Sequence, residues 1–376
     1  MSGGAAAGQG PSIRIVMTPG DAPRIEQRRP RAVRALIGRP AMEALAAVPL
    51  LLPICGEAQR VAAMRAIEAA RGEPASAEVE RWRDVGLLAE RAVSIAWRLA
   101  VDWPGLVGAA PDILSIKRVR ESARPIAEAA RAAATALPQE PSPGAIDEAL
   151  DATADRLRGL AAAATGEDLD RLLKRVSDDP SPMAEVLRRA AAAPLGLGQH
   201  DGHRLGPEAL AEIAAEALAH PDFDPEAPGA AAIEVGPLAA VGDPVVAEAE
   251  RRLGAGVLAR LLAGARAASQ WRHASRQVLE GYAPAPRPPV AVPDGAGIGV
   301  AMTARGPVLH RITLAEPAIA DWRVMAPTDW HFATNGPVSR MLQASSTVDP
   351  NQSDAALAAA SFDPCARCVV EVAGHA

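Results

Sequence analysis

The clearest guide to the architecture of this chain is the segment SFDPCARC, from Ser361 to Cys368, together with LLPICGEAQ, from Leu51 to Gln59. These segments lie near opposite ends of a 376-residue sequence and contain its three cysteines, Cys55, Cys365 and Cys368. An odd number of sparse cysteines does not suit a disulfide framework and is more typical of metal ligands, reactive thiols or core residues. The sequence predicts a metal unit bound by thiolates from both ends of the chain.

Spacing alone leaves several kinds of site open. Two cysteines separated by two residues can chelate one ion or form a redox disulfide. A redox pair usually lies at a helix start well inside a domain, whereas Cys365 and Cys368 lie close to the C-terminus. Structural zinc would need a fourth ligand, which His331 or His375 could supply. Zinc, another metal and inert core cysteines therefore all stay possible at this point.

Composition restricts the class of protein. Hydrophobic residues make up 49% of the chain and aromatic residues only 3%, so the core is expected to consist largely of alanine, leucine and valine in helices. A net charge of -6 gives no indication of a nucleic-acid partner. The longest apolar run, Ala44 to Ile54, is too short to span a bilayer. With no signal-like N-terminus, we expect a cytoplasmic protein without a membrane span.

Hydrophobic periodicity predicts a helical body flanked by short strands near both ends. We expect a flexible N-terminus over residues 1–11 and a single domain over residues 12–376. The predicted strands are Ser12–Met17, Gly297–Ala304, Val308–Leu314 and Ala320–Met325. The predicted helices are Pro30–Leu36, Glu57–Ala70, Ser76–Ala100, Ser122–Leu137, Ala145–Ala163, Asp168–Val176, Met183–Ala192, one ending at His220, Pro244–Leu262, Ala265–Glu280 and Val338–Ala344.

Two further motifs lie between the cysteine segments. They are ARGPVLHR, from Ala304 to Arg311, and APTDWHF, from Ala326 to Phe332. With the cysteine segments, and in this order, they resemble the large subunit of [NiFe] hydrogenases over residues 12–72 and 295–371. The resemblance implies an α+β fold, mostly α: a reduced hydrogenase large-subunit-like fold.

The departures from that family affect its chemistry. Ala58 stands where the enzymes have a second early cysteine, and Ala62 where they have a histidine. Glu371 occupies the position of the terminal histidine, and Val33 that of a proton-carrying glutamate. His331 replaces an asparagine. With three thiolates instead of four, nickel would be under-coordinated, so no nickel is expected.

This pattern resembles the HupK/HoxV family of hydrogenase accessory proteins. The resemblance implies a non-enzymatic scaffold that transiently holds an Fe(CN)2(CO) unit on Cys55, Cys365 and Cys368. By the same resemblance, Arg305 would contact the diatomic ligands, and His331 could be a further donor. HypC/HypD-type maturation proteins and a hydrogenase large subunit are the implied partners. A divergent hydrogenase large subunit and a zinc-binding structural relative are the alternatives.

Other polar residues are expected to have ordinary structural roles. His200 and His203 stand in a glycine-rich stretch that predicts a solvent-exposed loop, and His331 is expected in a loop as well. Glu371 is expected to be a solvated tail residue, and Thr328 and Asp329 are expected to be turn or cap residues.

Overall fold

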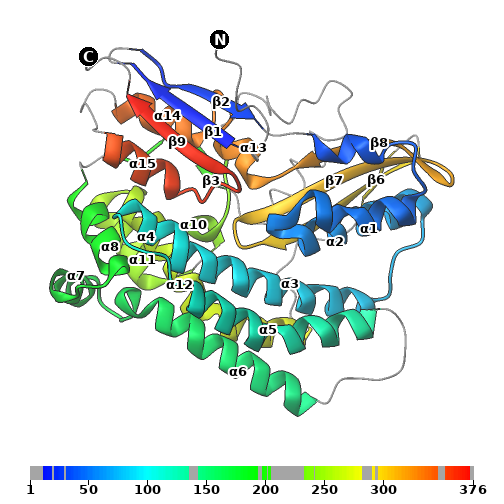
Figure 1. Cartoon of the computed structure of the whole chain (residues 1–376), viewed down its shortest axis with the longest axis horizontal. Helices are drawn as coiled ribbons and strands as arrows, with labels where there is room; N and C mark the ends of the chain where they lie inside the picture. The colour runs from blue at the N-terminus through cyan, green and yellow to red at the C-terminus, as the bar shows by residue number, and fades with distance from the viewer. Residues whose placement is uncertain are drawn as a thin grey trace, which may run out of the picture.

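The computed structural model of the protein describes residues 12–18, 21–28, 31–134, 143–193, 197–200, 202–204, 233–240, 242–281, 290–292, 295–345 and 352–372 (Figure 1). The expected flexible N-terminus and the helix predicted to end at His220 lie outside these residues.

Helices make up most of the described chain, as predicted. The α-helices are α1 (Ala41–Leu51), α2 (Gly56–Arg71), α3 (Ala77–Trp97), α4 (Trp103–Leu106), α5 (Ile113–Ala134), α6 (Pro143–Leu160), α7 (Leu169–Asp178), α8 (Pro182–Ala192), α10 (Pro237–Ala240), α11 (Pro244–Leu253), α12 (Val257–Leu279), α13 (Pro327–His331), α14 (Pro337–Ser345) and α15 (Gln352–Ala360). Short 3-10 helices are η1 (Ala32–Leu36), η2 (Pro53–Cys55) and η4 (Ala162–Ala164), and η3 (Arg98–Asp102) is a π-helix.

Local sequence explains several helix ends. Helix α2 ends at Gly72, which adopts a left-handed conformation with a φ of 71°. Helix α3 begins after Ser76, whose hydroxyl accepts a hydrogen bond from the Val79 amide at 3.3 Å. Asp168 and Ser181 cap α7 and α8 in the same way. These residues are start and stop signals, and they are the reason why the helical body can be predicted from the sequence.

Three sheets accompany the helices in the described part of the chain. Their strand orders are β2-β1-β9, β3-β4 and β5-β6-β7-β8. The strands are β1 (Ser12–Met17), β2 (Arg24–Arg28), β3 (His203–Arg204), β4 (Ile233–Glu234), β5 (Val290–Val292), β6 (Ala296–Thr303), β7 (Gly306–Ala315), β8 (Ala318–Met325) and β9 (Arg367–Val372).

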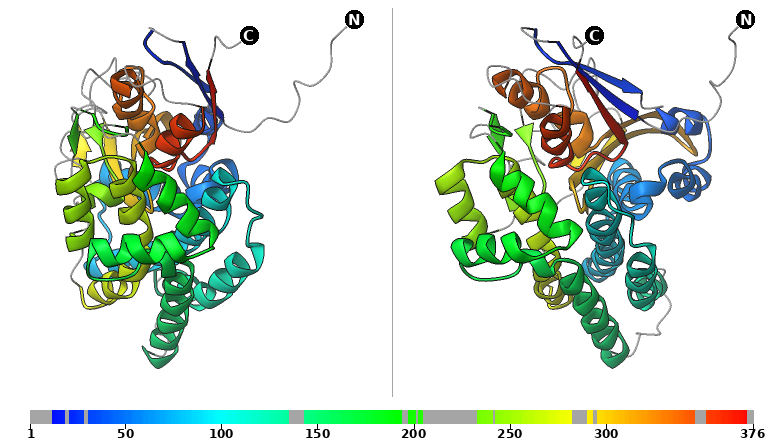
Figure 2. Two further views of the ribbon diagram at one scale, coloured as in Figure 1. Left: turned by 90° about the vertical axis from the view of Figure 1, so that its left-hand side faces the viewer. Right: turned by 60° about the vertical axis from the view of Figure 1, so that its left-hand side comes forward.

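The two ends of the described chain meet in one sheet. Strand β1 pairs antiparallel with β2 and parallel with β9, and Ile13 lies opposite Cys368. Figure 1 shows this layer in blue and red, and Figure 2 places it at the end of the molecule opposite helix α6. Ile13 and Ile15 are fully buried beneath it. This pairing fixes the C-terminal cysteine segment against the rest of the protein.

Helix α2 lies directly on strand β6, because β6 presents glycine to it. A Cβ atom at Gly299 would lie 2.1 Å from the Ala62 carbonyl oxygen, and one at Gly297 would lie 2.1 Å from that of Ala66. No side chain fits into these two spaces. The close contact places the N-terminus of α2, and therefore Cys55, beside the β6–β7 hairpin.

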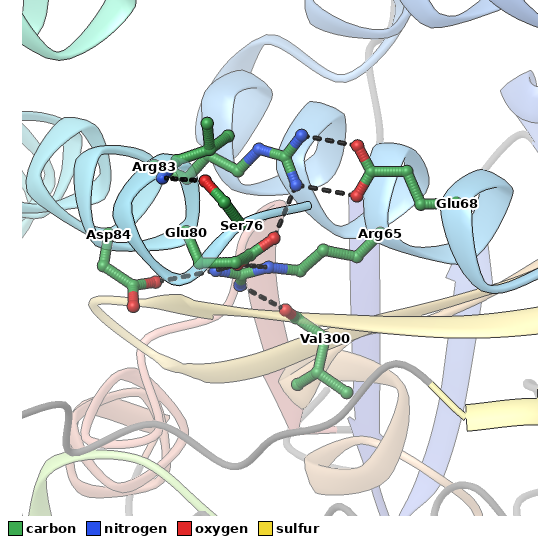
Figure 3. Close-up of polar contacts among 8 residues, drawn as sticks. Arg65, Glu68, Ser76, Glu80, Arg83, Asp84 and Val300 are labelled. Atoms are coloured by element: carbon green, nitrogen blue, oxygen red, sulfur yellow. Dashed lines mark hydrogen bonds and ion pairs between the residues drawn. The ribbon is translucent and has the colours of Figure 1, made fainter. Parts of the chain in front are cut away.

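A buried charge network joins α2, α3 and β6 (Figure 3). Arg65 donates to Glu80 at 2.7 Å, to Asp84 at 2.9 Å and to the Val300 carbonyl oxygen at 2.7 Å. Arg83, on α3, donates two hydrogen bonds to the Glu68 carboxylate, on α2. Because every donor of the Arg65 guanidinium has an acceptor, the charge is tolerated in the interior.

Several predicted elements need correction. Residues 41–51 form helix α1, where we expected only a buried segment; Leu50 is 83% exposed. Helix α5 begins at Ile113, not Ser122, and the break between α11 and α12 lies at Gly254, not near Ala263. After the last predicted helix we expected only a tail that carries two cysteines, and this segment contains α15 and β9.

None of the described helices is by itself long and apolar enough to cross a membrane. Only α1 taken together with residues 53–71 reaches that length and composition, and this pair is bent by 93°.

We predict that Gly299→Ala destabilises the protein by roughly 1–3 kcal/mol, because the new methyl group forces α2 away from β6. Urea unfolding followed by circular dichroism measures the change. Gly159→Ala, at a helical position with open space around it, is the matched control and should gain about 0.5–1 kcal/mol. Equal effects of the two substitutions would contradict the close packing.

Candidate metal centre

Asp363 organises the C-terminal cysteine segment. Its carboxylate is 8% exposed and forms an ion pair with Arg98, at the end of α3. Arg305, in the turn between β6 and β7, donates to the Asp363 carbonyl oxygen at 3.0 Å and lies 3.1 Å from its carboxylate. Asp363 has a φ of 49°, a left-handed conformation that aspartate tolerates better than most residues. The segment before Cys365 is thereby fixed to both the helical body and the hairpin.

Cys365 is oriented by Thr328 at the start of α13. The threonine hydroxyl donates to the Cys365 sulfur at 3.1 Å and accepts the Cys365 backbone N–H at 3.1 Å. Asp329 caps the same helix by accepting the Ala326 amide at 2.7 Å, as expected for a capping residue. Thr328 was expected to be a turn or cap residue as well, but its contacts place it beside a candidate ligand.

Cys55 occupies the N-cap position of α2 in partly apolar surroundings. Gln59 donates to its sulfur at 3.3 Å. Burial, together with the charges of the neighbouring Cys365 and Glu90, raises the pKa of the Cys55 thiol to about 12. The fold thus places Cys365 close enough to Cys55 to act on it electrostatically, although 309 residues separate the two in the sequence.

Glu90 lies at the same helix end. Its carboxylate accepts the backbone N–H groups of Glu57 at 2.7 Å and Ala58 at 2.9 Å. Burial raises the pKa of Glu90 to about 7, against the effect of these hydrogen bonds. The Glu90 carboxylate therefore interacts with the positive end of the α2 dipole. Without it, this end of the dipole would stabilise a Cys55 thiolate.

Arg305 is the cation of this region. It is 7% exposed, and although burial opposes its charge, Asp363, Cys365, Cys55 and Asp102 raise its pKa. Its NH1 group has no hydrogen-bond partner among the described residues. A buried N–H without an acceptor is costly, so this group suits an acceptor supplied by a bound ligand.

Cys368 and Glu371 lie on β9. Burial raises the pKa of Cys368 to about 12, with no contribution from another cysteine. Glu371, expected to be a solvated tail residue, forms an ion pair with Arg14 at 2.6 Å. Across the described part of the chain, no three histidine, cysteine or acidic residues are arranged as a group that could hold a metal ion. The structure thus places Cys55 near Cys365, whereas ligation by all three cysteines stays a prediction.

His331 does not join the cysteines. It ends helix α13, where we expected a loop, and its Nε2 accepts the Val235 amide at 3.1 Å. Burial lowers the pKa of His331 to about 4, and its ring packs on Phe362 at 5.2 Å. Together with Arg305 and Asp363 it lines a cavity of ≈ 20 Å³. His331 therefore packs against Phe362 of the cysteine segment and is not grouped with the cysteines.

The interpretation of His200 as a residue of an exposed loop is wrong. Its side chain is 3% exposed and lies 2.7 Å from Glu234. Arg260 binds the same carboxylate at 2.7 Å and stacks over the Phe362 ring at 4.1 Å. Although burial opposes it, the charges of Arg260 and His200 hold the pKa of Glu234 well below its usual range. His200, Glu234 and Arg260 thus form a buried charged cluster that packs against Phe362 through Arg260.

The positions that depart from the enzymes are tightly packed. Ala58 and Ala62 are both fully buried, and Ala62 faces Gly299 across the α2–β6 contact. The Ala62 side chain lies in a buried apolar cluster with Ala58, Leu87 and Val308. Apolar packing therefore occupies the place where the enzymes have a histidine.

Sequence reasoning did not identify Arg98, Thr328, Gln59 and Glu90 as parts of this site. Glu90 lies on α3 and Arg98 begins η3, in a segment whose periodicity indicates only a long helix. Asp363 stands beside Cys365 in the quoted motif and could have been singled out there. The others become visible only when α2, α3 and the hairpin meet.

Comparison with known proteins identifies the family. The chain is 31% identical over 327 residues to the hydrogenase expression/formation protein HupK of Azotobacter vinelandii, covering 85% of this chain and 84% of that protein. It belongs to this family of hydrogenase expression/formation proteins. The HoxV protein of Cupriavidus necator is 28% identical over 386 residues, covering 96% of this chain and 95% of that protein. No protein-family model matches the chain.

Solved structures confirm the predicted fold. The Ni-Fe-Se hydrogenase of Desulfovibrio vulgaris Hildenborough superposes with a TM-score of 0.58 at 15% identity, over 91% of this chain and 92% of that chain. An NAD+-reducing [NiFe]-hydrogenase gives a TM-score of 0.51 at 16% identity, over 92% of each chain. The protein has the fold of a [NiFe] hydrogenase large subunit.

We predict that Glu90→Gln flattens the dependence of stability on pH. Between about pH 4.5 and 7 the folded protein binds more protons at Glu90 than the unfolded chain, so stability falls as pH rises, by up to about 3 kcal/mol. Urea unfolding at pH 5 to 8 measures the slope. Glu78→Gln, at an exposed position on the same helix, is the control and should leave the slope unchanged.

Proposed function

We propose that this protein is a non-catalytic scaffold in [NiFe] hydrogenase maturation. Its cargo is an Fe(CN)2(CO) unit, held on cysteine thiolates before transfer to the hydrogenase large subunit. The observation that supports the proposal is the buried Arg305 guanidinium, which binds Asp363 two residues before Cys365 and interacts electrostatically with both Cys55 and Cys365. Membership of a family of hydrogenase expression/formation proteins supports a role in maturation.

The donor set fits this cargo. Iron that already carries three diatomic ligands needs only two or three more donors, and thiolates suit it. Cyanide nitrogen is a hydrogen-bond acceptor, and Arg305 NH1 is a buried donor with no partner among the described residues. The guanidinium also balances the negative charge that two thiolates bring into a buried site. Cys368 stays the predicted third ligand.

The same features favour release over permanent ligation. A thiol with a pKa of about 12, such as Cys55, must lose its proton when it binds metal. Each pKa unit above the ambient pH weakens metal binding about tenfold. Position 58 offers no further thiolate, since it is alanine. A scaffold that must give up its cargo benefits from such limited ligation.

The partners follow from this role. HypC/HypD-type proteins would supply the iron unit, and a hydrogenase large subunit would receive it. We place the reaction in the cytoplasm. The scaffold itself would perform no redox chemistry, because it lacks the fourth thiolate and the histidine that the hydrogenase pattern places at positions 58 and 62.

Infrared spectroscopy and metal analysis of protein purified without oxygen, from cells that express the maturation proteins, test the proposal. We expect carbon monoxide and cyanide stretching bands, with iron and without nickel. Cys55→Ala and Cys365→Ala should each remove most of the iron, and Cys368→Ala should reduce it. Ser177→Ala, on the exposed face of α7, is the control and should keep the wild-type iron content.

The other possible results of the infrared and metal analysis correspond to the alternative functions. Nickel together with iron and hydrogen oxidation would identify a divergent hydrogenase large subunit. Stoichiometric zinc without diatomic bands would identify a zinc-binding structural relative. Unchanged iron in all three cysteine variants would refute the assigned site.

Arg305→Lys tests the contact with the diatomic ligands. Lysine keeps the charge but not the planar set of donors, so we expect the cyanide bands to shift by several wavenumbers and iron content to fall about two- to fivefold. Arg323→Lys, on β8, is the control with an ion pair to Asp321 and should leave the bands unchanged. Identical cyanide bands in Arg305→Lys and wild type would exclude a hydrogen bond from Arg305.

A further inference from the structure

A chain of buried hydrogen bonds leads from strand β8 to the sulfur of Cys55. The Trp322 indole Nε1 lies 2.9 Å from His310 Nδ1, and His310 Nε2 lies 2.6 Å from Gln59 Oε1. Gln59 Nε2 is 3.3 Å from the Cys55 sulfur. Trp322, His310 and Gln59 are 2%, 0% and 4% exposed, so these contacts are shielded from water.

The tryptophan sets the tautomer of the histidine. An indole N–H can only donate, so His310 Nδ1 must be an acceptor. Burial lowers the pKa of His310 to about 3, which keeps the ring neutral at physiological pH. A neutral imidazole with an unprotonated Nδ1 carries its proton on Nε2. His310 therefore donates through Nε2 to whatever faces it.

The histidine in turn sets the orientation of the glutamine amide. An N–H on His310 Nε2 requires an acceptor, and Gln59 can offer one only through its carbonyl oxygen. The reversed amide would place two donors 2.6 Å apart. With the oxygen directed to His310, the amide nitrogen faces Cys55 and presents an N–H to the sulfur.

We propose that Trp322, His310 and Gln59 form a positioning chain that holds an N–H donor against the sulfur of Cys55. A donor at this place stabilises the thiolate relative to the thiol. A metal-bound thiolate that accepts this hydrogen bond also gives less electron density to the metal. The consequence for iron depends on the proposed function, whereas the hydrogen-bond chain itself requires no metal.

The chain also gives a physical reason for glutamine at position 59. Side chains of β7 and β8 reach α2 here because the glycines of β6 allow the helix to lie close to the sheet. His310 packs edge-on against the Trp322 ring, with 5.8 Å between the ring centroids. The Trp322 indole N–H, which can only donate, thus sets the direction of all three hydrogen bonds.

Nuclear magnetic resonance of metal-free, 15N-labelled protein tests the direction of the chain. We expect His310 to be protonated on Nε2 and unprotonated on Nδ1 from pH 5 to 8. In Trp322→Phe the Nδ1-protonated tautomer should become populated. A wild-type His310 protonated on Nδ1, or doubly protonated at pH 7, would overturn the proposal.

The alkylation rate of Cys55 by iodoacetamide at pH 9 tests the effect on the sulfur. Peptide mass spectrometry separates the three cysteines, so Cys368, whose pKa no other cysteine influences, is the internal control. Gln59→Leu should slow Cys55 about tenfold through loss of thiolate. Trp322→Phe should slow it less, and should add nothing in the Gln59→Leu background, because it acts through Gln59.

Matched controls separate this effect from general loosening of the fold. Gln270→Leu removes a glutamine that donates to Asp243, and Trp82→Phe alters a buried indole on α3. Both should leave the Cys55 rate within twofold of wild type at equal melting temperature. Additive effects of the two test substitutions, or an unchanged rate in Gln59→Leu, would refute the chain. Because the protein is metal-free, absence of iron in the infrared experiment leaves this result unaffected.

Discussion

The buried carboxylate of Asp363 is the point on which the arrangement of the candidate site depends. It lies between Arg98 of the helical body and Arg305 of the β6–β7 hairpin. Removing one partner of a buried ion pair generally costs about 3–5 kcal/mol, because the other charge stays in the interior without compensation. The position of Cys365, two residues further on, follows from this contact and from Thr328.

The electrostatics of the site suit temporary binding. Cys55 has a thiol that resists deprotonation, and Glu90 adds a negative charge at the helix end that could have stabilised a thiolate. Arg305 and the Gln59 amide act in the opposite direction. A site balanced between these effects binds the iron unit only when the thiols lose their protons to the solvent, and the thiols become neutral again when the unit leaves.

The sequence predicted much of the fold because its local signals are strong. Glycine and serine mark the end of α2 and the start of α3, and alternation in Ser12–Met17 marks β1. The prediction failed where a distant partner creates the element. Strand β9 exists because β1 offers its edge, and no pattern within Arg367–Val372 specifies that pairing. Helix α1 was missed because the apolar run Ala44 to Ile54 was taken only as a buried segment, and the helix carries Pro49 in its last turn.

By itself, the sequence determined the three cysteines, the DPC segment and the absence of a thiol at position 58 or an imidazole at position 62. Covalent composition fixes which donors are available, and no folding can change that. Only the tertiary structure decided which donors meet. Cys55 and Cys365 interact, while Cys368 lies on the β1–β9 sheet, because strand pairing and the Asp363 ion pairs set positions that sequence spacing does not encode.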